Sequence, residues 1–188
     1  MVDIIVQNIE YSYCSNCGHF NGYYEDTIDF ARSMYSKEEG KDYAKNYIEN
    51  YDSRVEDIYL PKVKFLLEVL KNEKDEDNLS LSDVGCGGGH FVKACENMNL
   101  QATGYDTNQE LIKLGSSKLN KNKLFYKDMD KINEIIEFND SKILSLVGVL
   151  EHVIKPLEVL EAFSKSKSVL VPVCNLNKLV ANVVNCCS

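Results

Sequence analysis

Four glycines stand within five residues in the segment Gly85-Cys86-Gly87-Gly88-Gly89, and the acid Asp83 lies two residues before it. Apolar residues alternate up to Val84, as in a buried strand, whereas Phe91 and Ala94 begin a pattern with helical spacing. We therefore predict a turn from a strand to a helix. Glycine is needed there because the backbone must approach a ligand that rests on the free N–H groups of the helix N-terminus. The chemistry indicated is ligand binding by the turn itself.

The spacing of the glycines separates two kinds of ligand. Gly85 and Gly87 match the dinucleotide fingerprint G-x-G-x-x-G/A, but its third position holds His90. What remains is an acid followed by three spaced glycines, Asp83-x-Gly85-x-Gly87-x-Gly89. A carboxylate beside the turn would repel a pyrophosphate, whereas it can receive the ammonium of an amino acid moiety. The pattern therefore favours a cationic ligand over a dinucleotide.

A second acid, Asp106, ends the next apolar stretch, about twenty residues further on, where a ribose-binding acid is expected in βαβ nucleotide sites. The sequence Thr107-x-x-Glu110 follows it directly and has the pattern of a capping box. We therefore predict that Asp106 lies at a strand tip and that Thr107 caps the next helix.

These residues together resemble motif I and the following acidic loop of class I S-adenosylmethionine-dependent methyltransferases. Further along, 125–129 is similar to the third strand of that family with its adenine-contacting loop, and 143–153 is similar to the fourth strand with its Leu-Glu-His segment. In our interpretation the resemblance covers residues 40–180. It implies an S-adenosylmethionine cofactor with its amino acid end by the glycines and its ribose on Asp106.

The cofactor-binding residues that the resemblance implies come from strand ends, from the loops after them and from the helices before the glycine turn: Asp83, Gly85, Cys86, Gly87, Gly89, Asp106, Thr107, Asp128, Met129, Val147, Gly148, Arg54 and Tyr47. Methyl transfer from a sulfonium is an in-line displacement, so most acceleration can come from positioning. A base is needed only if the acceptor loses a proton. His152 is the candidate, and the alternative is that it caps a helix or bonds to the backbone. We interpret Cys86 as a small packing residue rather than a nucleophile.

From residue 79 onwards strands alternate with helices, which predicts an α/β fold with a mostly parallel sheet covered on both faces. The strands are expected at 80–84, 101–105, 124–127, 142–147 and 168–173. The resemblance implies a Rossmann-like, doubly wound sheet with strand order 3-2-1-4-5. The ligand then lies beyond the strand carboxyl ends, beside strand one, where the order reverses.

The family core carries a sixth and a seventh strand, and we recognise neither after residue 173. An uncovered strand five would present an apolar edge, which natural sheets generally protect. The chain is therefore interpreted as a fragment, a truncated copy, or a chain completed by a second copy or by a partner chain over this edge.

We divide the chain into an N-terminal extension at 1–35, a helical lid region at 36–78 and a core at 79–188. The extension contains Cys14-x-x-Cys17, which resembles half of a zinc ribbon; the alternative is two cysteines in an ordinary turn.

In the lid region, Tyr43, Tyr47 and Tyr51 recur every four residues. They form either a packing stripe or, as the family suggests, rings of a lid that face the sulfonium. By the same resemblance Arg54 meets the methionine carboxylate, and the alternative is a solvated charge. Pro61 should end or kink any helix that runs through it from residue 54.

Composition restricts the partners. The chain has 188 residues and a net charge of −8, and no cluster of Lys and Arg that nucleic acid binding would need. Its start has no signal peptide and no membrane span, so we expect a cytoplasmic protein that does not bind a membrane. Seven cysteines without a secretory signal favour free thiols.

Three functions remain as hypotheses. The first is an S-adenosylmethionine-dependent methyltransferase that acts on a small molecule, with sugars or cell-envelope metabolites as the default acceptors. The second is a non-catalytic or partner-completed cofactor-binding subunit. The third is an NAD-dependent oxidoreductase, which His90 and Asp83 disfavour.

Overall fold

The computed structural model describes most of the residues that the resemblance covers, together with part of the N-terminal extension: 2–6, 9–16, 18, 20–22, 27, 29, 47–71, 79–120, 122–128, 131–166 and 168–171. They belong to two compact units, with a boundary between Ile28 and Asp29. Each unit is described by itself.

The first unit contains a small antiparallel sheet. Its strands are β1 (Val2–Val6), β2 (Ile9–Tyr13) and β3 (Phe20–Gly22), in the order β1-β2-β3. In register, Ile4 faces Tyr11 and Tyr11 faces Gly22. Cys14 directly follows β2, and the backbone N–H of Gly18 donates to the carbonyl oxygen of Cys14 at 2.8 Å.

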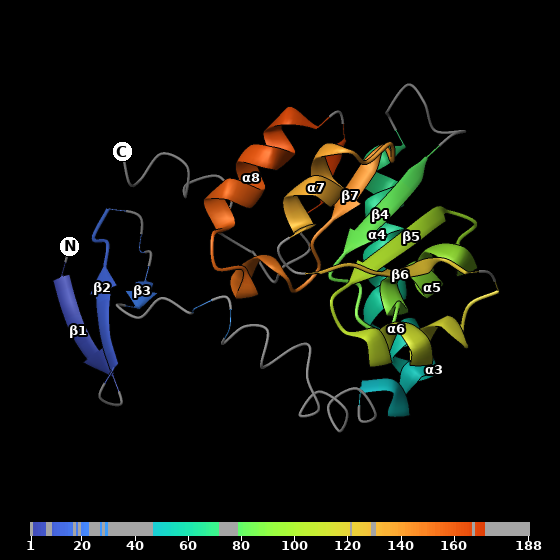
Figure 1. The fold of residues 1–188 in the computed structure, drawn as a ribbon, viewed down its shortest axis with the longest axis horizontal. Coiled ribbons are helices and arrows are strands. Elements are labelled where there is room, and N and C mark those ends of the chain that lie inside the picture. Colours follow the sequence, from blue (N-terminus) through green and yellow to red (C-terminus); the bar gives the residue numbers. More distant parts are fainter. Residues whose placement is uncertain are drawn as a thin grey trace. The chain divides into compact units, whose positions relative to one another are not determined.

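The second unit is built on a five-stranded parallel sheet (Figure 1). Its strands are β4 (Ser80–Val84), β5 (Gln101–Asp106), β6 (Leu124–Tyr126), β7 (Ile143–Ser145) and β8 (Val169–Val171). All four pairings are parallel and the order is β6-β5-β4-β7-β8. In sequence order this is 3-2-1-4-5, so the predicted fold class and strand order are confirmed.

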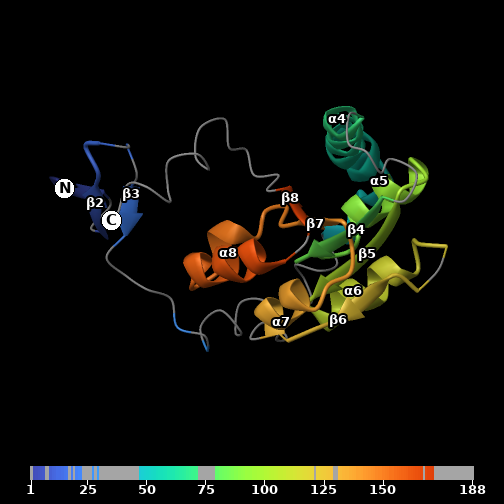
Figure 2. The same ribbon diagram turned by 90° about the horizontal axis from the view of Figure 1, so that it is seen from above.

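Helices cover both faces of this sheet. They are α3 (Tyr51–Arg54), the π-helix η1 (Val55–Tyr59), α4 (Leu60–Leu70), α5 (His90–Asn97), α6 (Gln109–Ser116), α7 (Ile132–Glu137), the 3-10 helix η4 (Leu150–His152) and α8 (Pro156–Lys165). Figure 2 shows α4 and α5 on one side of the sheet and α7 and α8 on the other. Pro156 opens α8 as predicted, since a first helical position has no partner for its N–H.

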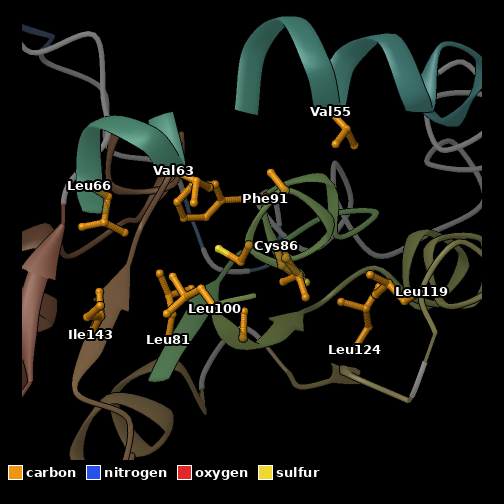
Figure 3. Packing of buried hydrophobic residues seen from close by; sticks show 14 of the residues in the cluster. Val55, Val63, Leu66, Leu81, Cys86, Phe91, Leu100, Leu119, Leu124 and Ile143 are labelled. Atoms are coloured by element: carbon orange, nitrogen blue, oxygen red, sulfur yellow. The ribbon is translucent and has the colours of Figure 1, made fainter. Parts of the chain in front are cut away.

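The core has one apolar layer on each face of the sheet, because successive strand residues point to opposite faces. Leu81 of β4 lies in the layer under α4 and α5, together with Val63 and Phe91 (Figure 3). Val84, three residues later, lies in the layer under α7 and α8. By the same alternation Asp83 shares the face of Leu81.

Pro61 does not end the helical path, which leaves a kink as the predicted alternative: α3 continues through the π-helix η1 into α4, and Pro61 is the second residue of α4. Proline lacks an N–H and its ring crowds the carbonyl four residues earlier, which the wider π-helical turn relieves. The cap of α6 is Asn108 rather than Thr107, because the Asn108 side chain accepts from the N–H of Leu111 at 3.0 Å.

The final segment, 172–188, lies outside the described residues. The prediction that a sixth and a seventh strand are lacking concerns this segment and stays a prediction. Within the described ranges, no helix is both long and apolar enough to span a membrane.

Candidate functional site

The glycine turn joins β4 to α5, as the sequence predicts. Gly85, Gly87 and Gly89 have φ angles of +79°, +54° and +74°. L-residues rarely adopt this left-handed conformation, so glycine is required at these positions. The N–H groups of Gly85 and Cys86 both donate to the carbonyl oxygen of Tyr105, at 2.7 and 3.0 Å. These bonds attach the turn to the end of β5.

Asp106 lies at the end of β5 and is bonded to the same turn. One carboxylate oxygen accepts from the N–H of Gly87 at 2.7 Å, and the other accepts from the N–H of Asn108 at 2.8 Å. Burial raises the pKa of Asp106, against the effect of the backbone N–H groups of Asn108, Gly87 and Thr107, which lower it. A carboxylate has about four acceptor positions, so room remains for a further donor such as a hydroxyl.

Asp83 lies deeper than the sequence suggests. It is 2% exposed, and the Ser145 hydroxyl donates to its carboxylate at 2.6 Å. Burial raises its pKa to about 7; the charge of Asp106 also raises it, and the bond from Ser145 and the charge of Lys62 oppose the shift. The carboxyl group therefore lies on the face of the sheet that α4 and α5 cover, because strand alternation puts Asp83 on the same face as Leu81.

The remaining core residues predicted for the site follow the ends of neighbouring strands. Thr107 follows β5, and its hydroxyl is buried without a hydrogen-bond partner among the described residues. Asp128 follows β6, and Val147 and Gly148 follow β7. The carboxyl ends of parallel strands meet at one edge of a sheet, so these residues lie at the same edge as the glycine turn. Met129 lies outside the described residues.

The lid helices lie directly on the glycine turn. A Cβ atom on Gly87 would lie 3.2 Å from the Tyr47 ring, so this ring covers the glycine. The Tyr51 hydroxyl donates to the carbonyl oxygen of Gly89 at 3.1 Å, and the Arg54 guanidinium stands 4.5 Å from the centre of the Tyr47 ring. Tyr51 is a packing residue, as one of the two interpretations of the tyrosine stripe predicts. Tyr43 lies outside the described residues.

His90 was not among the predicted site residues. It begins α5 and is 1% exposed, and its ring contacts the rings of Tyr47, Tyr51 and Tyr59 with centroid distances of 4.8, 4.2 and 5.5 Å. The spacing of Tyr47 and Tyr51 indicates that their rings share a helix face, whereas Tyr59 is not part of that stripe. Nothing in the sequence indicates that the face meets His90.

His152 and Cys86, the two side chains considered as a base and as a nucleophile, have different surroundings. His152 ends η4 and is exposed. Its backbone N–H donates to the carbonyl oxygen of Val149 at 2.8 Å. The role of its side chain as a base stays a prediction. Cys86 is buried, and burial raises the pKa of its thiol well above the usual range. A thiol of this kind is not a nucleophile, which supports the interpretation of Cys86 as a packing residue.

The predicted zinc site involves the first unit. Cys14 is half-buried, and Cys17 lies outside the described residues. In the part of the chain that the structure describes, no three metal-ligating side chains gather. Zinc binding therefore stays a prediction.

A cavity of about 650 Å³ lies away from the glycine turn, at the amino-terminal edge of β4 and β5. In its wall the Ser82 hydroxyl donates to the Asn139 side chain at 2.7 Å, and the Asn139 amide nitrogen donates to the Ser141 carbonyl oxygen at 3.3 Å. These polar groups bond to one another. The glycine turn, whose neighbours include unpartnered polar atoms, is the better candidate for a ligand site.

Comparison with known proteins identifies the family of the second unit. The family model described as "Methyltransferase domain" matches residues 51–169, from the start of α3 to the start of β8. The chain belongs to this methyltransferase domain family. The match therefore contains α3, the glycine turn and Asp106, and all of β4 to β7. The search of curated proteins found no match.

Solved structures share the fold of this methyltransferase domain. The plantazolicin methyltransferase BpumL, in complex with a monoazolic desmethylPZN analog and S-adenosylhomocysteine (SAH), is 21% identical with a TM-score of 0.53, over 77% of this chain and 54% of that chain. Magnesium protoporphyrin IX methyltransferase from Synechocystis PCC 6803, with bound S-adenosylmethionine, is 13% identical with a TM-score of 0.52, over 77% and 74% of the two chains.

A complex between the Haloferax volcanii Trm112 methyltransferase activator and a methyltransferase gives a TM-score of 0.50 at 17% identity, over 69% of this chain and 54% of that chain. The chain covers about half the length of BpumL and of the chain matched in this complex.

Proposed function

We propose that this methyltransferase domain binds S-adenosylmethionine at the carboxyl edge of β4 and β5 and transfers its methyl group to a small molecule. The observation that supports this most directly is the bond between the Asp106 carboxylate and the N–H of Gly87. It joins a ribose-binding type of acid to a glycine turn at the point where strand order reverses, which is the usual ligand position in such sheets. The family match and the cofactors named for two similar structures agree with the proposal.

In this proposal each part of the cofactor has its own group of residues. The methionine end meets Gly85, Cys86, Gly87, Gly89 and Arg54, with Asp83 beneath as a counter-charge to its ammonium; the ribose meets Asp106 and Thr107; the adenine end meets Asp128, Met129, Val147 and Gly148; and Tyr47 covers the ligand as part of the lid.

When bound, S-adenosylmethionine supplies a methyl group carried on a sulfonium sulfur. The sulfur is the leaving group and becomes a neutral thioether. The chain contributes by holding the ligand on the turn and by excluding water under the lid residues Tyr47 and Arg54.

For an acceptor that must lose a proton, we propose His152 as the base. Replacement of His152 by glutamine should then lower the rate of methyl transfer without changing SAH affinity.

The first test of the proposal is SAH binding. We expect Asp106→Ala to weaken SAH binding by about 100-fold or more, because hydrogen bonds from ribose hydroxyls to a charged acceptor are lost. Isothermal titration calorimetry measures the affinity, and the thermal midpoint shows whether the variant is folded. Asp140→Asn is the matched control, since Asp140 is an exposed acid at the opposite edge of the sheet. Equal SAH affinity in the wild type and Asp106→Ala would reject the proposed site.

We further propose that the methyl acceptors are small metabolites, with sugars and cell-envelope metabolites as the first candidates. We also propose that a second copy of the chain or a partner chain covers the edge of β8. An activator partner is named for one similar structure.

Native mass spectrometry of the purified chain reports cofactor, zinc and oligomeric state together. A mass increase of one zinc ion, lost in Cys14→Ser, would support a zinc site at Cys14 and Cys17, and a zinc-free mass would contradict it.

A further inference from the structure

The Tyr47 ring occupies a position with unusual neighbours. It covers Gly87 of the glycine turn, with 3.2 Å between the ring and the position of a Cβ atom on this glycine. The His90 ring contacts it in a T-shaped arrangement at 4.8 Å, and the Arg54 guanidinium lies 4.5 Å from its centre. One ring therefore stands among a motif glycine, an imidazole and a guanidinium. A ligand group that replaced this ring on Gly87 would lie beside both nitrogen-bearing side chains.

Those two side chains carry buried nitrogens without partners. Both ring nitrogens of His90 and the Nε of Arg54 are buried and have no hydrogen-bond partner among the described residues. Each such group costs about 1–3 kcal/mol, because its bonds to water are lost and not replaced. Native proteins contain few of them, and each one calls for an explanation. Here three unpartnered nitrogens belong to the two side chains that contact the ring over Gly87.

The charge around the ring favours an anion. Burial and the charge of Arg54 lower the pKa of His90 to about 4, while the Tyr47 carbonyl opposes the shift. At neutral pH the imidazole is therefore neutral and has one N–H to donate. His90 also begins α5, and the capping residue, Gly89, has no side chain to satisfy the first N–H groups of that helix. Arg54, the imidazole N–H and the helix N-terminus all favour a negatively charged group.

We propose that His90 joins Arg54, which the proposed function already places at the cofactor's amino acid end, in binding the carboxylate of that end, and that Tyr47 covers this position in the chain without ligand. Binding moves the Tyr47 ring off Gly87, and the carboxylate accepts hydrogen bonds from the His90 ring and from Arg54 Nε. This inference rests on the proposed function. It adds a ligand contact, His90, that the sequence did not indicate, and it assigns Tyr47 the role of a cover that the ligand displaces.

The test compares two ligands that differ only in the amino acid part. SAH has the carboxylate, and 5′-methylthioadenosine has neither carboxylate nor ammonium. We expect His90→Phe to weaken SAH binding by about 10- to 100-fold, the effect of losing a hydrogen bond to a charged group, and to leave 5′-methylthioadenosine affinity within about twofold. Its thermal midpoint should not fall, because phenylalanine fills the same space and removes two unpartnered nitrogens.

Every outcome has a defined meaning. Unchanged SAH affinity in His90→Phe, or equal losses for both ligands, would overturn the inference. A wild-type chain that binds neither ligand would reject the proposed function itself. If His90→Phe does not fold, His90→Leu provides the same test with a smaller apolar side chain, and a loss confined to SAH is again expected. Lys118→Met is the matched control, because this cation stands over Tyr51 rather than Tyr47. It should leave the ratio of the two affinities unchanged.

Discussion

Replacing Gly115 with alanine is expected to lower the free energy of unfolding by about 1–3 kcal/mol, the usual range for overpacking. Helix propensity alone predicts a gain of up to about 1 kcal/mol, since Gly115 lies inside α6. The structure reverses the sign. A Cβ atom on Gly115 would overlap the carbonyl oxygen of Gly88 and lie 2.6 Å from its carbonyl carbon. These are backbone atoms of the glycine turn, so either α6 or the turn must move.

Urea denaturation of Gly115→Ala and of Ser116→Ala measures this effect. Ser116 is the next residue of the same helix, and its replacement should raise stability by a few tenths of a kcal/mol, at most about 0.5, through propensity alone. SAH affinity should fall in Gly115→Ala and stay the same in Ser116→Ala, because only the first disturbs the turn. A Gly115→Ala variant that is more stable than the wild type would show that α6 does not rest on Gly88.

The second large effect is the pH dependence of stability that Asp83 causes. Its pKa is about 7 in the folded chain and about 3.9 in an unfolded one, so the folded chain binds a proton more tightly between these values. Stability from this group is present at low pH and is lost as pH rises from about 4 to about 7. The loss amounts to roughly 4 kcal/mol over the whole range.

Asp83→Asn isolates this contribution. The amide is neutral at every pH and can still accept the hydrogen bond from Ser145, so the variant should match the wild type near pH 4 and exceed its stability by several kcal/mol at pH 8. Urea denaturation at pH 5 and pH 8 gives the two differences. The exposed Asp140→Asn should give the same small difference at both values. A pH-independent difference for Asp83→Asn would show that the Asp83 carboxyl is ionised throughout.

The fold was predictable because its signals are local. Apolar strands of a buried parallel sheet, helices with their own periodicity, and Pro156 at a helix start can each be recognised within about a dozen residues. The site was predictable in part for the same reason. Gly85, Gly87 and Asp106 follow strand ends, and the ends of parallel strands meet at one edge whatever the loops do.

The missed features depend on contacts between distant segments. His90 is 31 to 43 residues from the three tyrosines around it, and Gly115 touches Gly88 across two elements. The depth of Asp83 depends on the helices that cover its face of the sheet. The cap of α6 falls on Asn108 because Asp106 bonds to the N–H of that same residue, and a capping-box pattern does not include this neighbour.

The bond between Asp106 and the Gly87 N–H has a further consequence for affinity. Since it joins two loops before any ligand arrives, an incoming adenosine group meets a preorganised surface and loses little binding free energy to loop ordering. The entropic cost of association then falls mainly on the helical segment that carries Tyr47. Substitutions that stiffen this segment with its ring away from the glycine should therefore tighten binding without adding a single contact.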